Sequence, residues 1–140
     1  MVRLATPQDI PWLTEQMLAL MPHTAWAKAS KGYKYNYDTV HKFIVNQLSR
    51  ADSVCYVWDG GVGDISAFCA GSCSQFYLPP YVPLMFEWGM AGPKHEIKHC
   101  WLALRQWAKR HNIEWIGRVK AEPGKSSVCV TEHMVWKRLI

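Results

Sequence analysis

The sequence predicts one domain of the mixed α/β class, and three observations lead to this fold class. The chain has 140 residues, 49% of them hydrophobic and 19% charged, which supplies enough apolar surface for a core that needs no disulfide or metal. Three segments repeat apolar residues at helical spacing, and six others read as strands. Their order is β-α-α-β-β-β-α-β-β, with no repeat or linker between them. We therefore expect a single domain over residues 1–140.

The chain opens with a predicted strand over residues 2–5 and a helix directly after it. Thr6 can cap that helix, Pro7 suits its first turn, and Asp9 is placed to reach back in a capping box. The apolar residues that we expect in the core are Ile10, Leu13, Met17 and Met21. Residues 22–37 follow as an irregular segment that is rich in aromatic side chains.

A second helix and a hairpin come next. Asp38 is the predicted cap of this helix, whose expected core residues are Val40, Phe43, Ile44 and Leu48. The pattern then changes, because Val54, Tyr56 and Trp58 alternate as they would in a half-buried strand. Gly60-Gly61 supplies a turn into a long strand over residues 64–76.

The second half of the chain predicts three strands and one helix. Leu78–Pro83 contains three prolines, which cannot donate to a central ladder, so we place the next strand over residues 84–90. A helix over residues 93–111 carries its apolar stripe on Ile97, Trp101, Leu104 and Ala108. Residues 113–120 and 128–138 are the last two strands.

The composition and the first residues argue against a membrane-spanning helix, a signal peptide and a set of disulfides. No apolar run approaches the roughly 20 residues that a membrane-spanning helix needs, and the first residues lack the layout of a signal peptide. The five cysteines are an odd number without paired spacing, which favours reduced thiols and a cytoplasmic location.

The charge is unevenly distributed along the chain. Residues 1–93 contain six Lys or Arg and seven Asp or Glu, whereas residues 94–140 contain ten and four. The basic last third predicts an anionic partner: a phosphorylated cofactor, nucleic acid or an acidic protein. The alternative is a solvated basic face with no ligand.

Three segments resemble the GNAT superfamily of N-acetyltransferases. Val2–Ile10 is similar to the opening strand and helix of that superfamily, and Leu102–Ile113 to its central helix and the start of its fifth strand. Val135–Leu139 is similar to the closing strand. The order of elements also agrees, so the resemblance covers almost the whole chain. It implies a mixed, mostly antiparallel sheet flanked by helices, and an enzyme that transfers acetyl groups from acetyl-CoA to an amine.

The short phage-encoded branch of the superfamily is the most similar in two places. These are His23-Thr24-Ala25-Trp26-Ala27 and the aromatic stretch before Glu87. This resemblance implies either an enzyme or a non-catalytic structural protein that meets a protein partner in a phage particle.

The superfamily holds the pyrophosphate of acetyl-CoA with a glycine-rich loop before its central helix. That loop corresponds to Gly92-Pro93-Lys94-His95-Glu96-Ile97, where the usual glycine pattern is broken. Pro93 removes an N–H donor and Glu96 adds a negative charge, while Lys94, Lys98 and a protonated His95 favour an anion. The resemblance implies a cofactor site on Met90, Gly92, Lys94, His95, Glu96, Ile97 and Lys98, with acetyl-CoA entering between splayed strands near Met90 and Ile116.

Acetyl transfer needs a base that removes a proton from the amine. Glu87 lies where the superfamily often keeps a carboxylate, so the resemblance implies that it is this base; the alternative is an ordinary strand carboxylate. The acid of the superfamily is a tyrosine on a late helix, but no tyrosine follows Tyr81.

A different motif overlaps the cofactor loop. His95-Glu96-Ile97-Lys98-His99 has the H-E-x-x-H pattern of zinc peptidases, in which the two histidines bind Zn²⁺ from one helix face. Lys98 between the ligands and the position in the first helical turn count against a zinc hydrolase. The third ligand would have to be Glu114, Glu122 or His133, and we expect no metal.

Overall fold

The structure is a computed structural model that describes residues 1–23, 35–75, 83–123 and 130–138. Within the strands, the side chains of residues 74, 75, 83 and 118–138 are also outside the description. The segment around Trp26 that resembles phage proteins therefore lies outside the described residues.

The observed elements follow the predicted order. They are β1 (Val2–Leu4), a 3₁₀ turn (Pro7–Asp9), α1 (Ile10–Leu20), a second 3₁₀ turn (Met21–His23), α3 (Tyr37–Ser49), β2 (Ser53–Asp59), β3 (Ile65–Gln75), β4 (Pro83–Ala91), α4 (Lys94–Arg110), β5 (Trp115–Pro123) and β6 (Val130–Arg138). The boundaries differ from the predicted ones by at most three residues, the largest difference being the end of β5 at Pro123. The proline-rich segment ends at Pro83, which is the first residue of β4, a position where a missing N–H is tolerated.

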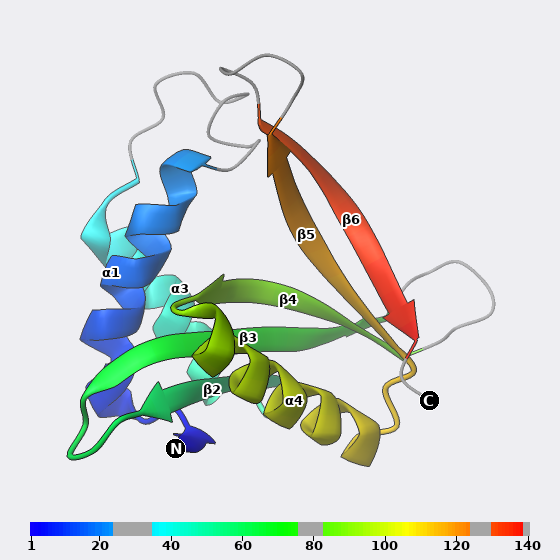
Figure 1. Ribbon diagram of the computed structural model, residues 1–140, viewed down its shortest axis with the longest axis horizontal. Coiled ribbons are helices and arrows are strands. Elements are labelled where there is room, and N and C mark those ends of the chain that lie inside the picture. The colour runs from blue at the N-terminus through cyan, green and yellow to red at the C-terminus, as the bar shows by residue number, and fades with distance from the viewer. Residues whose placement is uncertain (24–34, 76–82, 124–129, 139–140) are drawn as a thin grey trace.

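The six strands form one sheet in the order β1-β2-β3-β4-β5-β6. Every neighbouring pair is antiparallel except β4 and β5, which are parallel. Figure 1 shows that α4 covers one face of the sheet, whereas α1 and α3 lie together on the other. The predicted mixed, mostly antiparallel α/β fold is confirmed.

Each face of the sheet has its own apolar cluster. The cluster under α1 and α3 contains Ile10, Leu13, Met17, Val40, Ile44, Cys55, Val57, Phe68 and Ala70. The cluster under α4 contains Val54, Cys69, Met85, Cys100, Leu104, Ala108, Ile113 and Ile116. Successive strand residues alternate between the two clusters, because side chains of a strand point to opposite faces. The four described cysteines are free thiols, as expected.

The start of α1 is held by a buried carboxylate. Asp9 is 4% exposed and accepts hydrogen bonds from the Thr6 N–H at 2.7 Å and from Arg3 at 2.7 and 3.0 Å. Arg3 also donates to Asp59 at the end of β2, 2.8 Å away. The predicted reach of Asp9 back to Thr6 is thus confirmed, and the same carboxylate ties the helix to β1.

Two predictions about α3 are wrong. The helix begins at Tyr37 and its cap is Asn36, whose Oδ1 accepts from the Thr39 N–H at 2.8 Å; Asp38 lies inside the first turn. Phe43 was expected in the core, but it is 38% exposed, with its ring edge-on to Trp88 at a centroid distance of 5.5 Å. Val40, Ile44 and Gln47 form the buried face instead.

Among the described residues, no helix is long and apolar enough to cross a membrane.

Candidate functional site

The parallel strands β4 and β5 form a fork. They pair only where Leu84–Phe86 meets Trp115–Gly117, and Figure 1 shows them separating beyond that point. Ile116 lies at the closed end and is fully buried. Since the ladder stops at Phe86, the rest of β4 is not paired with β5, and its backbone on that side can meet a ligand.

A β-bulge in β4 lies directly beside the closed end of the fork. Gly71 pairs with Glu87 and Ala70 pairs with Gly89, so Trp88 is the extra residue. A Cβ on Gly89 would lie 2.7 Å from the Phe68 ring, which explains the glycine there. Trp88 packs on the cluster under α1 and α3, whereas Met90 packs on the cluster under α4.

Glu87 is the first residue of β4 beyond the pairing with β5. It lies opposite Gly71, is half-buried, and is followed at once by the bulge. The structure therefore places the predicted base at the point where the strands separate.

Gly92 makes the turn from β4 into α4. Its φ is +128°, a conformation that favours glycine. A Cβ on this residue would lie 2.5 Å from the Ala67 Cβ and 2.6 Å from the Ser66 carbonyl oxygen. The glycine thus meets a requirement of the backbone where the superfamily pattern has Arg or Gln.

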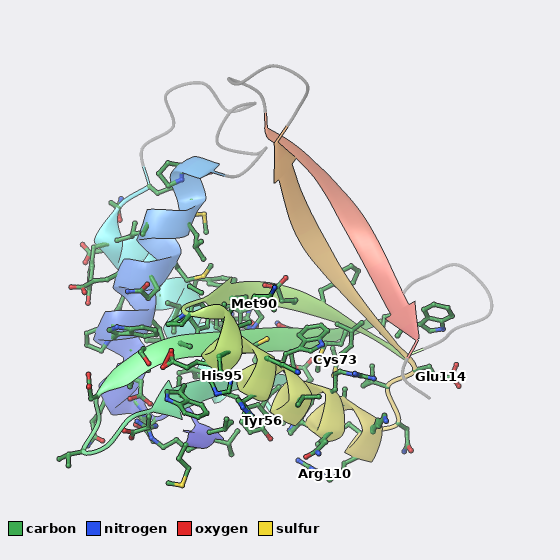
Figure 2. The ribbon with its side chains drawn as sticks, in the orientation of Figure 1. Tyr56, Cys73, Met90, His95, Arg110 and Glu114 are labelled. Carbon is green, nitrogen blue, oxygen red and sulfur yellow. The ribbon has the colours of Figure 1, made fainter. Side chains whose placement is uncertain are left out.

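A hollow of about 650 Å³ lies between the end of β4 and the first turns of α4. Its lining residues are Met90, Lys94, His95, Ile97, Lys98 and Trp101. Figure 2 shows Met90 and His95 near each other at this end of α4. Five of the seven predicted cofactor residues line the hollow, while Gly92 and Glu96 do not. The sequence predicts Trp101 only as part of the apolar stripe. Its position four residues after Ile97 puts both side chains on one helix face, and this spacing is the signal that Trp101 also lines the hollow.

The lining has two chemical parts. Met90, Ile97 and Trp101 form an apolar wall, and Lys94 and Lys98 are exposed cations. The first intrahelical bond of α4 runs from the Ile97 N–H to the Pro93 carbonyl, at 3.0 Å. The three preceding N–H groups are thus at the positive end of the helix dipole, where an anion is favoured.

Glu96 and Cys100 take no part in the hollow. The Glu96 carboxylate accepts a hydrogen bond from the Ser66 hydroxyl on β3, so its negative charge is directed at the sheet and not at the expected phosphate site. Cys100 is fully buried, and burial raises the pKa of its thiol to about 11. It is a core residue and not a nucleophile.

The two histidines of the H-E-x-x-H motif lie beside each other on α4. Their ring centroids are 4.7 Å apart, and Trp58 of β2 lies 6.1 Å from His95 and 5.4 Å from His99. Within the described parts of the chain, no group of three or more His, Cys, Asp or Glu side chains could hold a metal ion. Glu114 lies beyond the opposite end of α4 (Figure 2), and the side chains of Glu122 and His133 are outside the description.

Comparison with known proteins identifies structures that share this fold. No family model matches the sequence, and neither does any curated protein. Among solved structures, an acetyltransferase from Vibrio fischeri aligns with a TM-score of 0.62 at 16% identity, over 84% of this chain and 93% of the other. A predicted acetyltransferase from Clostridium acetobutylicum, solved with acetyl-CoA, aligns with a TM-score of 0.64 at 18% identity, over 89% and 83%.

The fold also occurs in a protein with a different description. A transcriptional regulator from Bacillus halodurans aligns with a TM-score of 0.64 at 9% identity, over 86% of this chain and 81% of the other. The chain thus has the fold of the GNAT acetyltransferases, as its sequence resemblance implied. At these identities the likeness concerns the fold, and the activity has to be argued from the site.

Proposed function

We propose that this protein transfers the acetyl group of acetyl-CoA to an amine. The observation that carries the proposal is the position of the hollow. It sets an apolar wall and two cations at the start of α4 beside Met90, which belongs to the part of β4 beyond the pairing with β5. A ligand with a long, weakly polar arm and a phosphorylated end matches both parts.

The residues present fit acetyl-CoA. Lys94 and Lys98 would attract its phosphates together with the first N–H groups of α4. Met90, Ile97 and Trp101 would pack along its pantetheine arm, and the unpaired side of β4 would bond its amides. Bound acetyl-CoA supplies a thioester whose acetyl carbon an amine can attack. The hydrogen bond between Glu96 and Ser66 directs the carboxylate toward the sheet, which lessens the charge conflict expected in this loop.

Glu87 is the proposed base. Its place at the closed end of the fork sets a carboxylate beside the expected path of the amine. There it can accept the proton that the attacking nitrogen must lose. Glu87→Gln keeps the shape of the side chain but removes this function, so it should lower acetylation much more than it weakens the binding of acetyl-CoA.

Calorimetry with acetyl-CoA tests the proposal. We expect saturable binding, and a loss of about tenfold in affinity for Lys94→Ala and for Lys98→Ala, since each removes a contact worth about 1.4 kcal/mol to phosphate. Lys42→Ala is the matched control, because Lys42 is an exposed lysine on α3 at the other face of the sheet. No binding at about millimolar acetyl-CoA, a free energy near −4 kcal/mol, would end the enzyme proposal.

The second candidate is a non-catalytic binding protein on the same fold. It is favoured by the absence of any tyrosine after Tyr81, since the superfamily uses a late tyrosine as its acid. In this case the protein would meet a protein partner, and the phage particle implied by the resemblance remains the candidate setting. Failure of acetyl-CoA binding by the folded protein would favour this candidate.

A further inference from the structure

The outward surface of α4 is strongly basic. The helix contains five Lys or Arg and one Glu in 17 residues, and that Glu is bonded to Ser66 on the sheet. Lys94 and Lys98 lie in its first turns and Lys109 and Arg110 in its last, and all four side chains are exposed. We name these four residues the cation row. At 1.5 Å per residue the helix is about 25 Å long, so the row consists of one pair of cations at each end, with the exposed Leu102 between the pairs.

Aromatic rings lie at one end of the cation row. Trp58, His95 and His99 form a ring cluster, with centroid distances between 4.7 and 6.1 Å. Both histidines are exposed and Trp58 is half-buried. Figure 2 shows His95 and Arg110 toward opposite ends of α4. Both lie on the side of α4 next to β2, because the His95 ring is 6.1 Å from that of Trp58 and Arg110 donates to the Tyr56 hydroxyl at 3.5 Å. A planar base could therefore stack on the ring cluster while the backbone attached to it runs along the cations.

We propose that this face of α4 binds single-stranded nucleic acid. A strand that spans α4 would bring phosphates to the pair of exposed cations at each end, and unpaired bases offer flat faces for the ring cluster. A duplex conceals those faces within its stacked pairs, and an acidic protein has no general need for a ring platform. Lys94, Lys98 and His95 also line the hollow, whereas Lys109, Arg110 and His99 do not. The proposal itself does not depend on acetyl transfer.

Fluorescence anisotropy with a labelled oligothymidylate of about 20 nucleotides tests the proposal. With four phosphate contacts, the logarithm of the binding constant should fall with the logarithm of salt concentration with a slope of about −3. Lys109→Gln combined with Arg110→Gln should weaken binding about tenfold or more and bring the slope to about −1.4. His99→Ala should weaken binding about fivefold or more through lost stacking, with the slope unchanged.

Controls separate this site from the hollow and from non-specific charge. Lys42→Gln removes an exposed cation on the other face of the sheet, so it should leave binding unchanged. The glutamine double variant should retain the affinity of the wild-type protein for acetyl-CoA, and its thermal unfolding shows whether α4 remains folded. Oligouridylate of the same length, compared with oligothymidylate, distinguishes RNA from DNA as the preferred strand.

Three results would overturn the proposal. The first is no change in anisotropy at about 50 mM salt with about 100 μM protein, where even non-specific binding is seen. The second is equal weakening by Lys42→Gln and by the double variant on α4. The third is tighter binding of a duplex than of either single strand, which would exclude stacking as the basis of recognition. If the wild-type protein does not bind acetyl-CoA, that result would contradict the proposed function but not the proposed nucleic-acid site.

Discussion

The two faces of the sheet are fastened to their helices by different chemistry. Under α1 and α3, buried polar contacts reinforce the apolar packing: Asp9 is bonded to Arg3 at 2.7 Å, and the Gln47 Oε1 accepts from the Ser72 hydroxyl at 2.7 Å. Under α4, the fully buried contacts are Cys100, Leu104 and Ala108, and the connection from β4 passes through Gly92.

This difference separates stability from ligand binding. On the α1 and α3 face, polar side chains are used within the protein, where they fix the helices to particular strands. On the α4 face, buried apolar residues supply most of the attachment, together with the Glu96–Ser66 hydrogen bond and a 3.5 Å contact from Arg110 to the Tyr56 hydroxyl. Lys94, Lys98 and Lys109 are exposed to water. Charged groups that are not engaged inside the fold can bind an anion without breaking a structural contact. Both the hollow and the cation row accordingly lie on the α4 side.

The largest effect is expected at Gly92, which attaches α4. Gly92→Ala would force an L-residue to φ +128° and bring its Cβ to 2.5 Å from Ala67. We expect a loss of about 3 kcal/mol or more in the free energy of unfolding, from strain and overpacking together. Urea unfolding measures it.

Gly61→Ala is the matched control for this substitution. Gly61 has a similar φ of +134°, but a Cβ there would meet nothing within 4 Å. It should cost only the backbone strain, about 1 kcal/mol. Equal losses at the two glycines would show that close packing on Ala67 does not hold α4 in place.

The second largest loss of stability is expected at Asp9, on the face of the sheet that α1 and α3 cover. Burial by itself raises the pKa of Asp9, but the Arg3 guanidinium and the Thr6 N–H outweigh it, and the pKa is lowered. A lowered pKa in the folded state stabilises the protein above the unfolded pKa, near pH 4, and this contribution is lost as pH falls through the folded value. Asp9→Asn should therefore cost about 2 kcal/mol at neutral pH.

The difference between wild type and Asp9→Asn should shrink as the pH is lowered below about 4. Urea midpoints at neutral and acidic pH measure this change. Asp52→Asn serves as the comparison, because its ion pair with Arg50 is exposed to solvent, and it should change stability little. A difference between wild type and Asp9→Asn that is independent of pH would contradict the assigned role of the carboxylate.

The smallest effect is expected at the start of α3. Asn36→Ala removes the side chain that accepts from the Thr39 N–H and should cost about 1 kcal/mol. Asp38→Ala removes only a favourable charge near the helix N-terminus and should cost about 0.3 kcal/mol. Thermal unfolding of the two variants distinguishes the observed cap from the predicted one; the reverse order would support Asp38.

Much of the fold could be predicted because local patterns agree with it. The strand alternation at Val54, Tyr56 and Trp58, and the apolar spacing along α4, locate elements to within one or two residues. The first residue of a helix is harder to predict, because Asn36 and Asp38 are equally good caps by residue type. Phe43 was misplaced because an aromatic residue beside a buried stripe can also lie at its edge, against Trp88.

Less of the candidate site could be predicted from residues alone. The sequence shows that the glycine pattern of the loop is broken. Only the structure shows that Glu96 is hydrogen-bonded to Ser66, and that the turn into α4 requires a glycine at position 92. The bulge at Trp88 depends on pairing with β3, which no local pattern in β4 reveals. Trp101 reaches the same hollow as Met90 because α4 folds back over the sheet.

By itself, the sequence determined the order of the elements, the apolar stripes and the concentration of positive charge after residue 93. These properties follow from periodicity and composition, which act over a few neighbouring residues. Only the tertiary structure decided where the fork opens, which cations border the hollow and which lie along the free surface of α4. Those arrangements depend on contacts between residues far apart in the chain, such as Gly92 with Ala67 and Trp58 with His99, and no local pattern specifies them.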